Sequence, residues 1–258
     1  MKVIILAGGW GTRLGRLSDL IPKPMVEIGK RPILWHIMKI YSFYGYDEFI
    51  ICLGVNGEVI KNYFFHYDMN NNDFTINLNT KDIDFHGKTN QEKWKVTLVD
   101  TGLNTLKGAR IKRVEKYLDD EINMLTYGDG LSDISINQLI KFHKSHGKTL
   151  TITGVHPPSR FGELNEKDGR VLKFQEKPQT SVGLINGGFM VFNKELLDYL
   201  TSDENCDLEK GAFEKLTEMG EVMVYKHEGN WECMDHERDV VHLNKLWISN
   251  KAFWKVWD

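Results

Sequence analysis

The chain has 258 residues, of which 41% are hydrophobic and 27% are charged, and it contains six prolines. This composition is typical of a folded globular protein and excludes a disordered, collagen-like or low-complexity chain. The 33 basic residues against 36 acidic ones give a net charge of −3, without the basic excess usual for nucleic-acid binding. We therefore expect no nucleic-acid partner, and any anionic ligand must be bound by local charges.

The cysteine content and the apolar runs indicate the compartment. Three cysteines, Cys52, Cys206 and Cys233, form no Cys-x-x-Cys pair. An odd number of scattered cysteines argues against a disulfide framework and favours a reducing compartment. The apolar run near the N-terminus is too short for a signal peptide, and no stretch contains 18 apolar residues in a row. The sequence thus predicts a soluble cytoplasmic protein with no membrane partner.

Strands and helices alternate in the first half of the chain. A continuous apolar run at 2–7 ends in two glycines, the pattern of a strand buried on both faces that leads into a loop. In chain order, we expect a strand at 2–7, helices at 31–46 and 56–67 on either side of a strand at 49–53, an excursion or edge hairpin at 68–93, a strand at 94–100, an amphipathic segment at 108–118, a strand at 122–127 and a helix at 135–146. This alternation predicts a parallel sheet with right-handed crossovers.

Beyond Thr149 the expected elements become shorter and mixed. They are strands at 149–155, 170–175, 187–192 and 222–226, a helix near 194–201 and another from about 238. The run 252–257, with two of the seven tryptophans, is interpreted as core cover for a terminal helix, with a subunit contact as the alternative. We expect an α/β fold with a Rossmann-like, mostly parallel central sheet, helices on both faces and a smaller mixed α+β lobe, all within one domain.

A glycine-rich loop follows the first strand and is the first candidate site. Gly8, Gly9 and Gly11 let backbone N–H groups approach a phosphate or base, and Arg13 and Lys23 bring positive charge to the same rim. Pro22 and Pro24 fix the backbone around Lys23. A dinucleotide-binding fingerprint would need glycine at position 14, which is Leu14, and the Gly-Lys-Ser/Thr of a P-loop is absent. A tight turn without a ligand is the simpler alternative.

Two aspartates are candidate metal ligands. Asp129 lies between two glycines at the expected carboxyl end of a buried strand, where ligands of open α/β sheets bind. An isolated Gly-Asp-Gly is also a common turn, so a metal site requires a second carboxylate, for which Asp235 is the candidate. The histidines match no zinc pattern, and no Gly-x-Ser-x-Gly motif supports a serine nucleophile.

A third group of polar residues suits a phosphorylated sugar. Lys177, before a proline, can pair with a phosphate, while Glu176 and Asn186 can bind sugar hydroxyls, with Gly187 following. Arg110 is a further candidate phosphate ligand. Taken singly, residues such as Lys177, Glu176 and Asn186 are more often solvated polar side chains without a ligand. For Arg110, a solvated basic residue among Lys107, Lys112 and Arg113 is an equal alternative.

In this order, the motifs Leu-Ala-Gly-Gly-x-Gly-Thr-Arg-Leu, Pro-Lys-Pro-Met, Gly-Asp-Gly, Glu-Lys-Pro and Asn-Gly-Gly resemble the sugar-phosphate nucleotidyltransferases over nearly the whole chain. Longer runs, among them 23–29, 32–38, 99–102 and 142–144, are most similar to the branch that transfers a cytidylyl group from CTP to glucose 1-phosphate. The segment 206–213 departs from the Glu-x-Glu-Pro-Leu type run of that branch, and His236 replaces a threonine after Asp235.

The resemblance implies a reaction and a set of roles. CTP and α-D-glucose 1-phosphate would give CDP-glucose and pyrophosphate with Mg²⁺, for the synthesis of surface polysaccharide such as lipopolysaccharide or capsule, in a homo-oligomer, commonly a hexamer. The lobe 1–147 would bind the nucleotide, and 148–258, with the C-terminal helix, the sugar phosphate. Arg13, Lys23 and Asp129 are implied as catalytic, and Asp129 and Asp235 as metal ligands. The implied nucleotide-binding residues are Leu6, Ala7, Gly8, Gly9, Gly11, Thr12, Arg13, Lys23, Thr105, Arg110 and Gly128, and those for the sugar phosphate are Glu176, Lys177, Asn186 and Gly187.

Two alternative functions stay open. One is the same cytidylyl transfer to a different acceptor, such as another sugar phosphate or a polyol phosphate. The other is a catalytically silent module that binds a nucleotide sugar. This alternative is disfavoured because all five expected charged residues are present, namely Arg13, Lys23, Asp129, Lys177 and Asp235.

Overall fold

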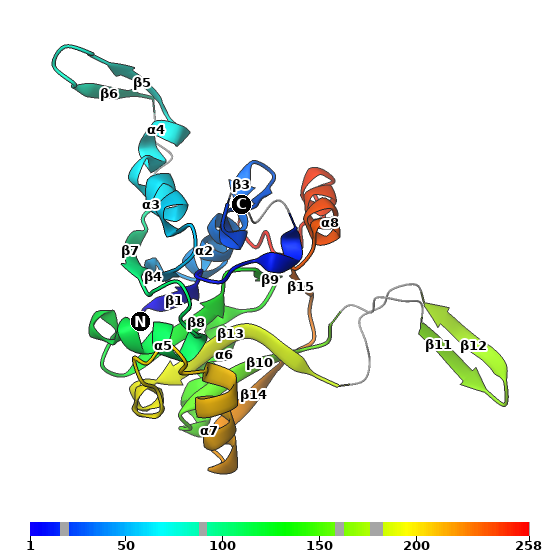
Figure 1. The fold of residues 1–258 in the computed structure, drawn as a ribbon. Coiled ribbons are helices and arrows are strands. Elements are labelled where there is room, and N and C mark those ends of the chain that lie inside the picture. The colour runs from blue at the N-terminus through cyan, green and yellow to red at the C-terminus, as the bar shows by residue number, and fades with distance from the viewer. Residues whose placement is uncertain (16–20, 88–91, 158–162, 176–182, 258) are drawn as a thin grey trace.

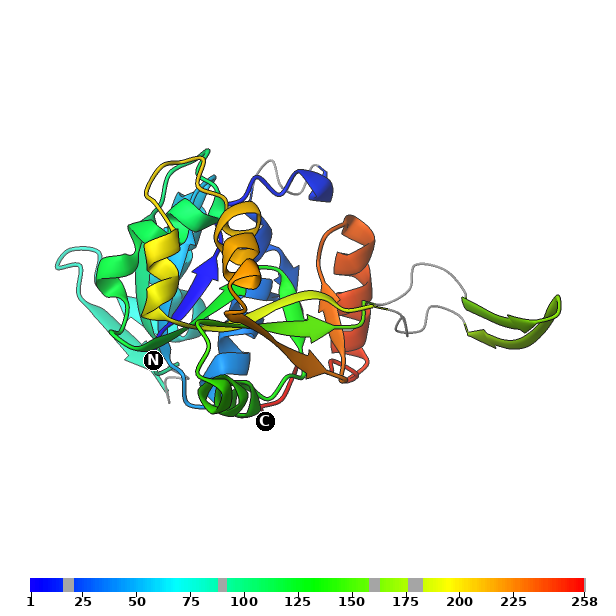
Figure 2. The same ribbon diagram turned by 90° about the horizontal axis from the view of Figure 1, so that it is seen from below.

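The structure, a computed structural model, describes residues 1–15, 21–87, 92–157, 163–175 and 183–257. One seven-stranded sheet forms its centre, and the hairpin β11–β12 extends away from that body in both views (Figure 1, Figure 2). In sheet order the strands are β14 (Val222–His227), β10 (Leu150–Val155), β13 (Ile185–Asn193), β8 (Ile122–Tyr127), β1 (Val3–Leu6), β4 (Glu48–Leu53) and β7 (Lys95–Asp100).

The sheet is mostly parallel, with β13 as the exception. β1 pairs in parallel with β4 and β8, β4 with β7, and β10 with β14. β13 runs antiparallel to both of its neighbours, β8 and β10. The N-terminal end of β13 therefore lies at the same sheet edge as the C-terminal ends of the other strands. The predicted α/β class with a mostly parallel central sheet is confirmed.

Helices cover both faces of the sheet because its central strands are apolar on both sides. In β1, Val3 and Ile5 belong to one buried cluster, and Ile4 and Leu6 to the other. The first cluster packs against α2 (Ile33–Phe43), α3 (Gly57–Phe65), α6 (Ile136–His146) and α8 (Glu237–Ile248). The second packs against α5 (Lys107–Arg113), the 3₁₀ segment η4 (Lys194–Tyr199), the π-helix η5 (Leu208–Phe213) and α7 (Glu214–Glu218).

Shorter elements complete the described chain. The single-turn helices are η1 (Thr12–Leu14), η2 (Lys23–Met25), α4 (Tyr67–Asn71) and η3 (Glu115–Tyr117). The two-stranded ladders are β2 (Glu27–Ile28) with β3 (Arg31–Pro32), β5 (Asp73–Ile76) with β6 (Ile83–His86), β9 (Gly130–Ser132) with β15 (Trp231–Cys233), and β11 (Glu163–Lys167) with β12 (Arg170–Gln175).

Most of the expected elements are present, with differences that have local causes. The stretch 68–93 contains a hairpin, one of the two predicted alternatives. The amphipathic segment at 108–118 leaves α-helical geometry after Arg113 and continues as a 3₁₀ turn. Strands β10, β13 and β14 from the second half join the same sheet as β1. The division into two lobes at residue 147 stays a prediction.

The C-terminal run covers the core without forming a helix. Residues 252–257 contain a turn and no helix, so the last helix is α8. Trp254 is completely buried, and its Nε1 donates to Nδ1 of His36 on α2 at 3.3 Å. Trp257 packs its ring edge-on against Trp35. The interpretation of this run as core cover agrees with these contacts, and the helix expected from about residue 238 is α8.

His36 is held as a neutral imidazole in this core. Its Nε2 lies 2.8 Å from the Ile28 carbonyl oxygen, and its Nδ1 accepts from Trp254, so the proton resides on Nε2. Burial lowers the pKa of His36 from 6.5 to about 4. In the unfolded chain the imidazole therefore takes up a second proton as the pH falls below about 6.5. In the folded chain it does so only near pH 4.

We expect this histidine to make the fold sensitive to acid. Its contribution to the free energy of unfolding is full above pH 6.5 and falls by about 3 kcal/mol toward pH 4. Urea unfolding at pH 7 and pH 4.5 measures the loss, and His36→Gln, which keeps a donor but does not titrate, should show a smaller loss. An equal loss in the variant would exclude His36 as the cause.

Candidate active site

The glycine-rich loop leaves the sheet at the end of β1 and packs tightly against Arg110. The Ala7 N–H still donates to Cys52 of β4, and the chain then turns through Gly8 to Gly11, whose φ of 64° begins η1. The Gly8 carbonyl accepts from Nη2 of Arg110 at 2.9 Å. A Cβ on Gly8 would overlap the guanidinium, which is the physical reason for glycine at this position.

Arg110 connects this loop with the loop after β7. Its side chain is only 4% exposed, and its guanidinium bonds to protein oxygens. The acceptors are Leu53 O, Thr101 Oγ1, Gly102 O, Gly8 O and Leu103 O, at 2.7 to 3.1 Å. With these bonds formed, Arg110 holds the two loops against each other at the wall of the site.

A cavity of about 480 Å³ opens between these loops and the end of β8. It brings together most of the residues expected to bind a nucleotide. Its lining includes Leu6, Ala7, Gly8, Gly9, Gly11, Lys23, Thr105, Arg110 and Gly128, together with Asp129. Thr12 is exposed and does not line it.

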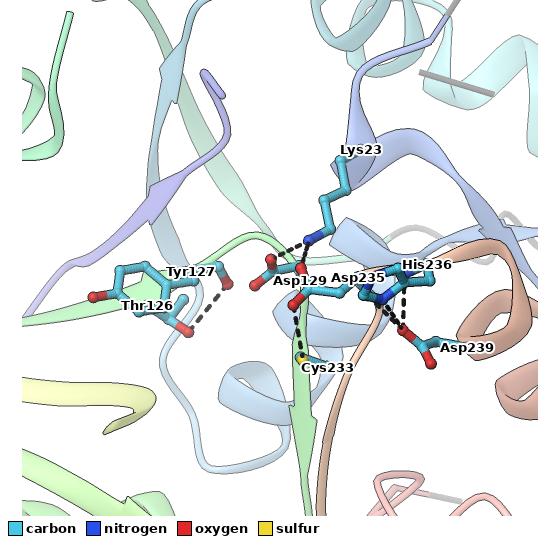
Figure 3. Close-up of polar contacts among 8 residues, drawn as sticks. All are labelled: Lys23, Thr126, Tyr127, Asp129, Cys233, Asp235, His236 and Asp239. Atoms are coloured by element: carbon cyan, nitrogen blue, oxygen red, sulfur yellow. Dashed lines mark hydrogen bonds and ion pairs between the residues drawn. The ribbon is translucent and has the colours of Figure 1, made fainter. Parts of the chain in front are cut away.

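Lys23 joins the two predicted aspartates at the edge of this cavity. Its Nζ lies 2.6 Å from Oδ2 of Asp129 and 2.6 Å from Oδ1 of Asp235 (Figure 3). All three side chains are partly buried. Burial by itself lowers the pKa of Lys23, but the charges and hydrogen bonds of the two carboxylates outweigh it and raise the pKa above its ordinary value. The carboxyl groups of positions 129 and 235 therefore share one site.

Three separate segments deliver these side chains. Lys23 opens η2 directly after Pro22, whose extended φ and ψ angles set the entry of the chain. Asp129 lies between β8 and β9, and Asp235 follows β15. The antiparallel β9–β15 pair places Gly130 opposite Cys233, and the Met234 N–H donates to the Asp129 carbonyl at 2.9 Å. This short ladder brings two residues 106 positions apart into one place.

The donor set fits a divalent cation such as Mg²⁺. The two carboxylates carry one negative charge more than Lys23 neutralises, and they converge on a common positive group. Among the described residues, no group of three or more His, Cys, Asp or Glu could hold a metal. Two carboxylates completed by substrate phosphates are an arrangement that magnesium commonly uses.

Cys233 does not add a thiolate to this pair. Its Sγ lies 3.7 Å from Oδ2 of Asp235. Burial, followed by the charges of Asp235 and Asp129, raises the pKa of the Cys233 thiol to about 12. The thiol therefore stays protonated at neutral pH and acts as a weak donor to the carboxylate.

The expected sugar-phosphate residues are only partly described. Asn186 and Gly187 lie at the start of β13, and the Gly187 carbonyl accepts from Nε1 of Trp231 at 2.7 Å. Glu176 and Lys177 lie outside the described residues, as does the side chain of Arg13. Of the five charged groups expected to gather, the structure brings together Lys23, Asp129 and Asp235.

Sequence reasoning did not assign several residues of the cavity wall. These are Trp10, Pro24, Leu103, Asn104, Leu106, Lys107 and Tyr127. Trp10 is 57% exposed, so this bulky residue of the glycine loop lines the cavity at the protein surface and needs no space in the core. Leu103 to Lys107 follow the carboxyl end of β7, and Tyr127 directly precedes Gly128. Their position just after or at the end of a predicted strand is the sequence signal that could have identified them.

The comparisons with known proteins agree with this geometry. The family model described as nucleotidyl transferase matches residues 2–249. The chain is 48% identical over 259 residues to a glucose-1-phosphate cytidylyltransferase of Salmonella typhimurium, with all of both chains covered. It is 43% identical over 257 residues to a probable glucose-1-phosphate cytidylyltransferase of Bacillus subtilis, again with full coverage of both.

Solved structures share the fold. A putative glucose-1-phosphate thymidylyltransferase from Bacillus anthracis superimposes with a TM-score of 0.66 at 15% identity, covering 95% of this chain and 94% of the other. A UDP-glucose pyrophosphorylase from Acinetobacter baumannii gives a TM-score of 0.68 at 17% identity, covering 94% and 91%. Given the match over almost its whole length, this chain belongs to the nucleotidyl transferase family.

Proposed function

We propose that the protein transfers the cytidylyl group of CTP to α-D-glucose 1-phosphate and produces CDP-glucose and pyrophosphate. The observation that carries the transferase chemistry is the meeting of Asp129, Asp235 and Lys23 at the edge of the glycine-loop cavity. The choice of CTP and glucose 1-phosphate is supported by the full-length similarity to curated cytidylyltransferases.

The reaction is an in-line displacement at phosphorus. A phosphate oxygen of the sugar 1-phosphate forms a bond to the α-phosphorus of CTP. The bond from that phosphorus to the bridging oxygen of the β-phosphate breaks, and pyrophosphate leaves with the electron pair. The attacking oxygen is already ionised at neutral pH, so no general base is required.

The chief obstacle is repulsion between two anions, and the site opposes it with fixed charges. Lys23 is stiffly presented by η2 and stays protonated, so it can bind phosphate oxygens as a point charge. Backbone N–H groups of the glycine loop can approach the nucleotide because Arg110 holds that loop in place. Holding both reactants in this way can supply on the order of 7–11 kcal/mol of the barrier.

A magnesium ion is the cation that we propose for Asp129 and Asp235. When bound there, it would neutralise phosphate charge and orient the triphosphate. The carboxylates already hold the Lys23 ammonium, so metal and lysine compete for the same oxygens. Magnesium binding would therefore make Lys23 available to the phosphates.

The wider setting of the reaction stays a prediction. We propose a cytoplasmic location and a supply of CDP-glucose for surface polysaccharide, as the family resemblance implies. Among the helices in the described part of the chain, none combines the length and apolar character needed to cross a lipid bilayer.

We also propose a homo-oligomer, with a hexamer as the expected size. The β5–β6 hairpin extends away from the sheet, and an isolated two-stranded hairpin is marginally stable in water (Figure 1). It exposes apolar side chains, among them Phe74, Phe85 and Leu78, the last with 73% of its surface accessible. A second copy of the chain would cover them.

Pyrophosphate release tests the proposed reaction. Purified protein is incubated with Mg²⁺, glucose 1-phosphate and each nucleoside triphosphate in turn, and the sugar nucleotide is identified by mass spectrometry. We expect release with CTP only and a product with the mass of CDP-glucose. If CTP gives pyrophosphate with another sugar phosphate or a polyol phosphate but not with glucose 1-phosphate, the alternative acceptor is favoured. No release with any pair would contradict the transferase assignment.

Asp129→Asn tests the role of the carboxylates. The amide keeps the size of the side chain but removes the charge that binds the cation, so turnover should fall by a factor on the order of 10²–10³ or more. The thermal unfolding temperature should change little, since Lys23 keeps its ion pair with Asp235. Asp198→Asn, at an exposed position, is the matched control. Unchanged turnover in the Asp129 variant would remove the proposed metal site.

Light scattering coupled to size exclusion tests the oligomer. We expect a mass of six chains for the native protein and a lower mass for Leu78→Asp, because a charge at the hairpin tip opposes burial against another copy. A single-chain mass for the native protein at micromolar concentration would contradict the oligomer.

A further inference from the structure

A polar cluster on the cavity wall centres on the Tyr127 hydroxyl. This hydroxyl donates to Oε1 of Glu209 at 2.7 Å and accepts from Nδ2 of Asn186 at 3.2 Å. The three residues come from the end of β8, the first turn of the π-helix η5 and the start of β13. The cluster thereby joins the segment 206–213, which departs from the family pattern, to the strand that leads into Asp129.

Lys107 attaches the cluster to the nucleotide cavity. Its Nζ forms an ion pair with the same Oε1 of Glu209, and it lies 5.1 Å from the centre of the Tyr127 ring. Lys107 and Tyr127 both line the cavity. Glu209 therefore neutralises a cation on the wall of the cavity while it binds the tyrosine beside it.

The Glu209 carboxylate gives this hydrogen-bond chain a fixed direction. An ionised carboxylate can only accept, so the Tyr127 hydroxyl must donate to Glu209 and accept from Asn186. A neutral amide in place of Glu209 could also donate and turn the hydroxyl proton toward Asn186, whose amide could then bond to Tyr127 or to the Gly188 N–H but not to both.

Asn186 is thereby locked in one orientation. Its Oδ1 accepts from the Gly188 N–H at 2.9 Å, while its Nδ2 donates to Tyr127. Gly188 has a φ of 81°, and a Cβ there would lie 2.8 Å from Cδ2 of Tyr127, so the close approach requires glycine. Among the described residues, no other group bonds to this amide, so one N–H and one lone pair stay available for a hydroxyl-bearing ligand.

The sheet order places the Asn186 amide on the side of the site where the sugar phosphate would bind. β8, which leads to Asp129, lies between β1 and β13. The glycine loop follows β1, and Asn186 begins the antiparallel β13, so the two flank the end of β8 at the same sheet edge. A nucleotide in the cavity of the glycine loop leaves the β13 side for the second reactant.

We propose that Glu209 is a positioning residue for the sugar phosphate, because it fixes the direction of the Glu209–Tyr127–Asn186 chain and so the donor and acceptor that Asn186 presents to a sugar hydroxyl. This inference rests on the proposed function, in which a phosphorylated sugar is the acceptor. It assigns a role in sugar recognition to the segment 206–213.

Steady-state kinetics of Glu209→Gln and Tyr127→Phe test this role. Each change removes the fixed direction, so the KM for glucose 1-phosphate should rise roughly tenfold, the equivalent of one hydrogen bond. Neither the KM for CTP nor the Kd for CTP alone in calorimetry should rise, because Lys107, once released from Glu209, only adds positive charge to the cavity. The kcat should stay near the native value. The double variant should cost no more than the larger single change, because both act through one chain.

Two controls separate the possible outcomes. Glu214→Gln makes the same chemical change at an exposed position five residues further on and should leave every parameter unchanged. A parallel rise of both KM values, or an unchanged KM for the sugar phosphate in an active protein, would overturn the role of Glu209 and leave the proposed function intact. A native protein that binds CTP but transfers to no sugar phosphate would overturn both.

Discussion

The contact of one ammonium with two carboxylates is the interaction on which this site depends. Lys23, Asp129 and Asp235 lie on three segments that are far apart in the sequence, yet both oxygen–nitrogen distances are 2.6 Å. Two partly buried carboxylates side by side repel each other, and the arrangement is stable only with a cation between them. Such a place is suited to a reaction whose difficulty is the repulsion between anions.

The fold supports this contact by its sheet topology. Parallel strands β1, β4, β7 and β8 bring their loops to one edge, and the antiparallel β13 adds its N-terminal end to that same edge. Arg110 then ties the loop after β1 to the loop after β7 through buried hydrogen bonds to their carbonyl groups. Loops that would otherwise move independently form one wall, as a site that works by positioning requires.

Much of the fold could be predicted from the sequence because its signals are local. The apolar run of β1 and the helical spacing of α2 are complete within a few residues, and the motifs at Gly8 and Asp129 directly follow predicted strands. The pairing of β9 with β15 could not be predicted, because each strand has three residues and the partners lie about 100 positions apart. That ladder is what brings Asp235 to Asp129.

Arg110 and Glu209 show a second limit of sequence reasoning. A basic residue among other basic residues gives no sign that its guanidinium bonds to five protein oxygens, so a phosphate contact was the natural expectation for Arg110. Glu209 lies in a π-helix, a geometry without a strong sequence signal, and its partners Tyr127 and Lys107 come from two other elements. Burial and partner identity depend on the tertiary structure, which periodicity does not encode.

Anomalous diffraction from a crystal grown with Mn²⁺ and CTP shows whether Asp129 and Asp235 bind one metal ion together. We expect one strong anomalous peak within coordination distance of both carboxylates, with the Lys23 ammonium turned toward the phosphates. A peak bound by only one of these carboxylates, or a metal at a different place while Lys23 still bridges both aspartates, would contradict this expectation.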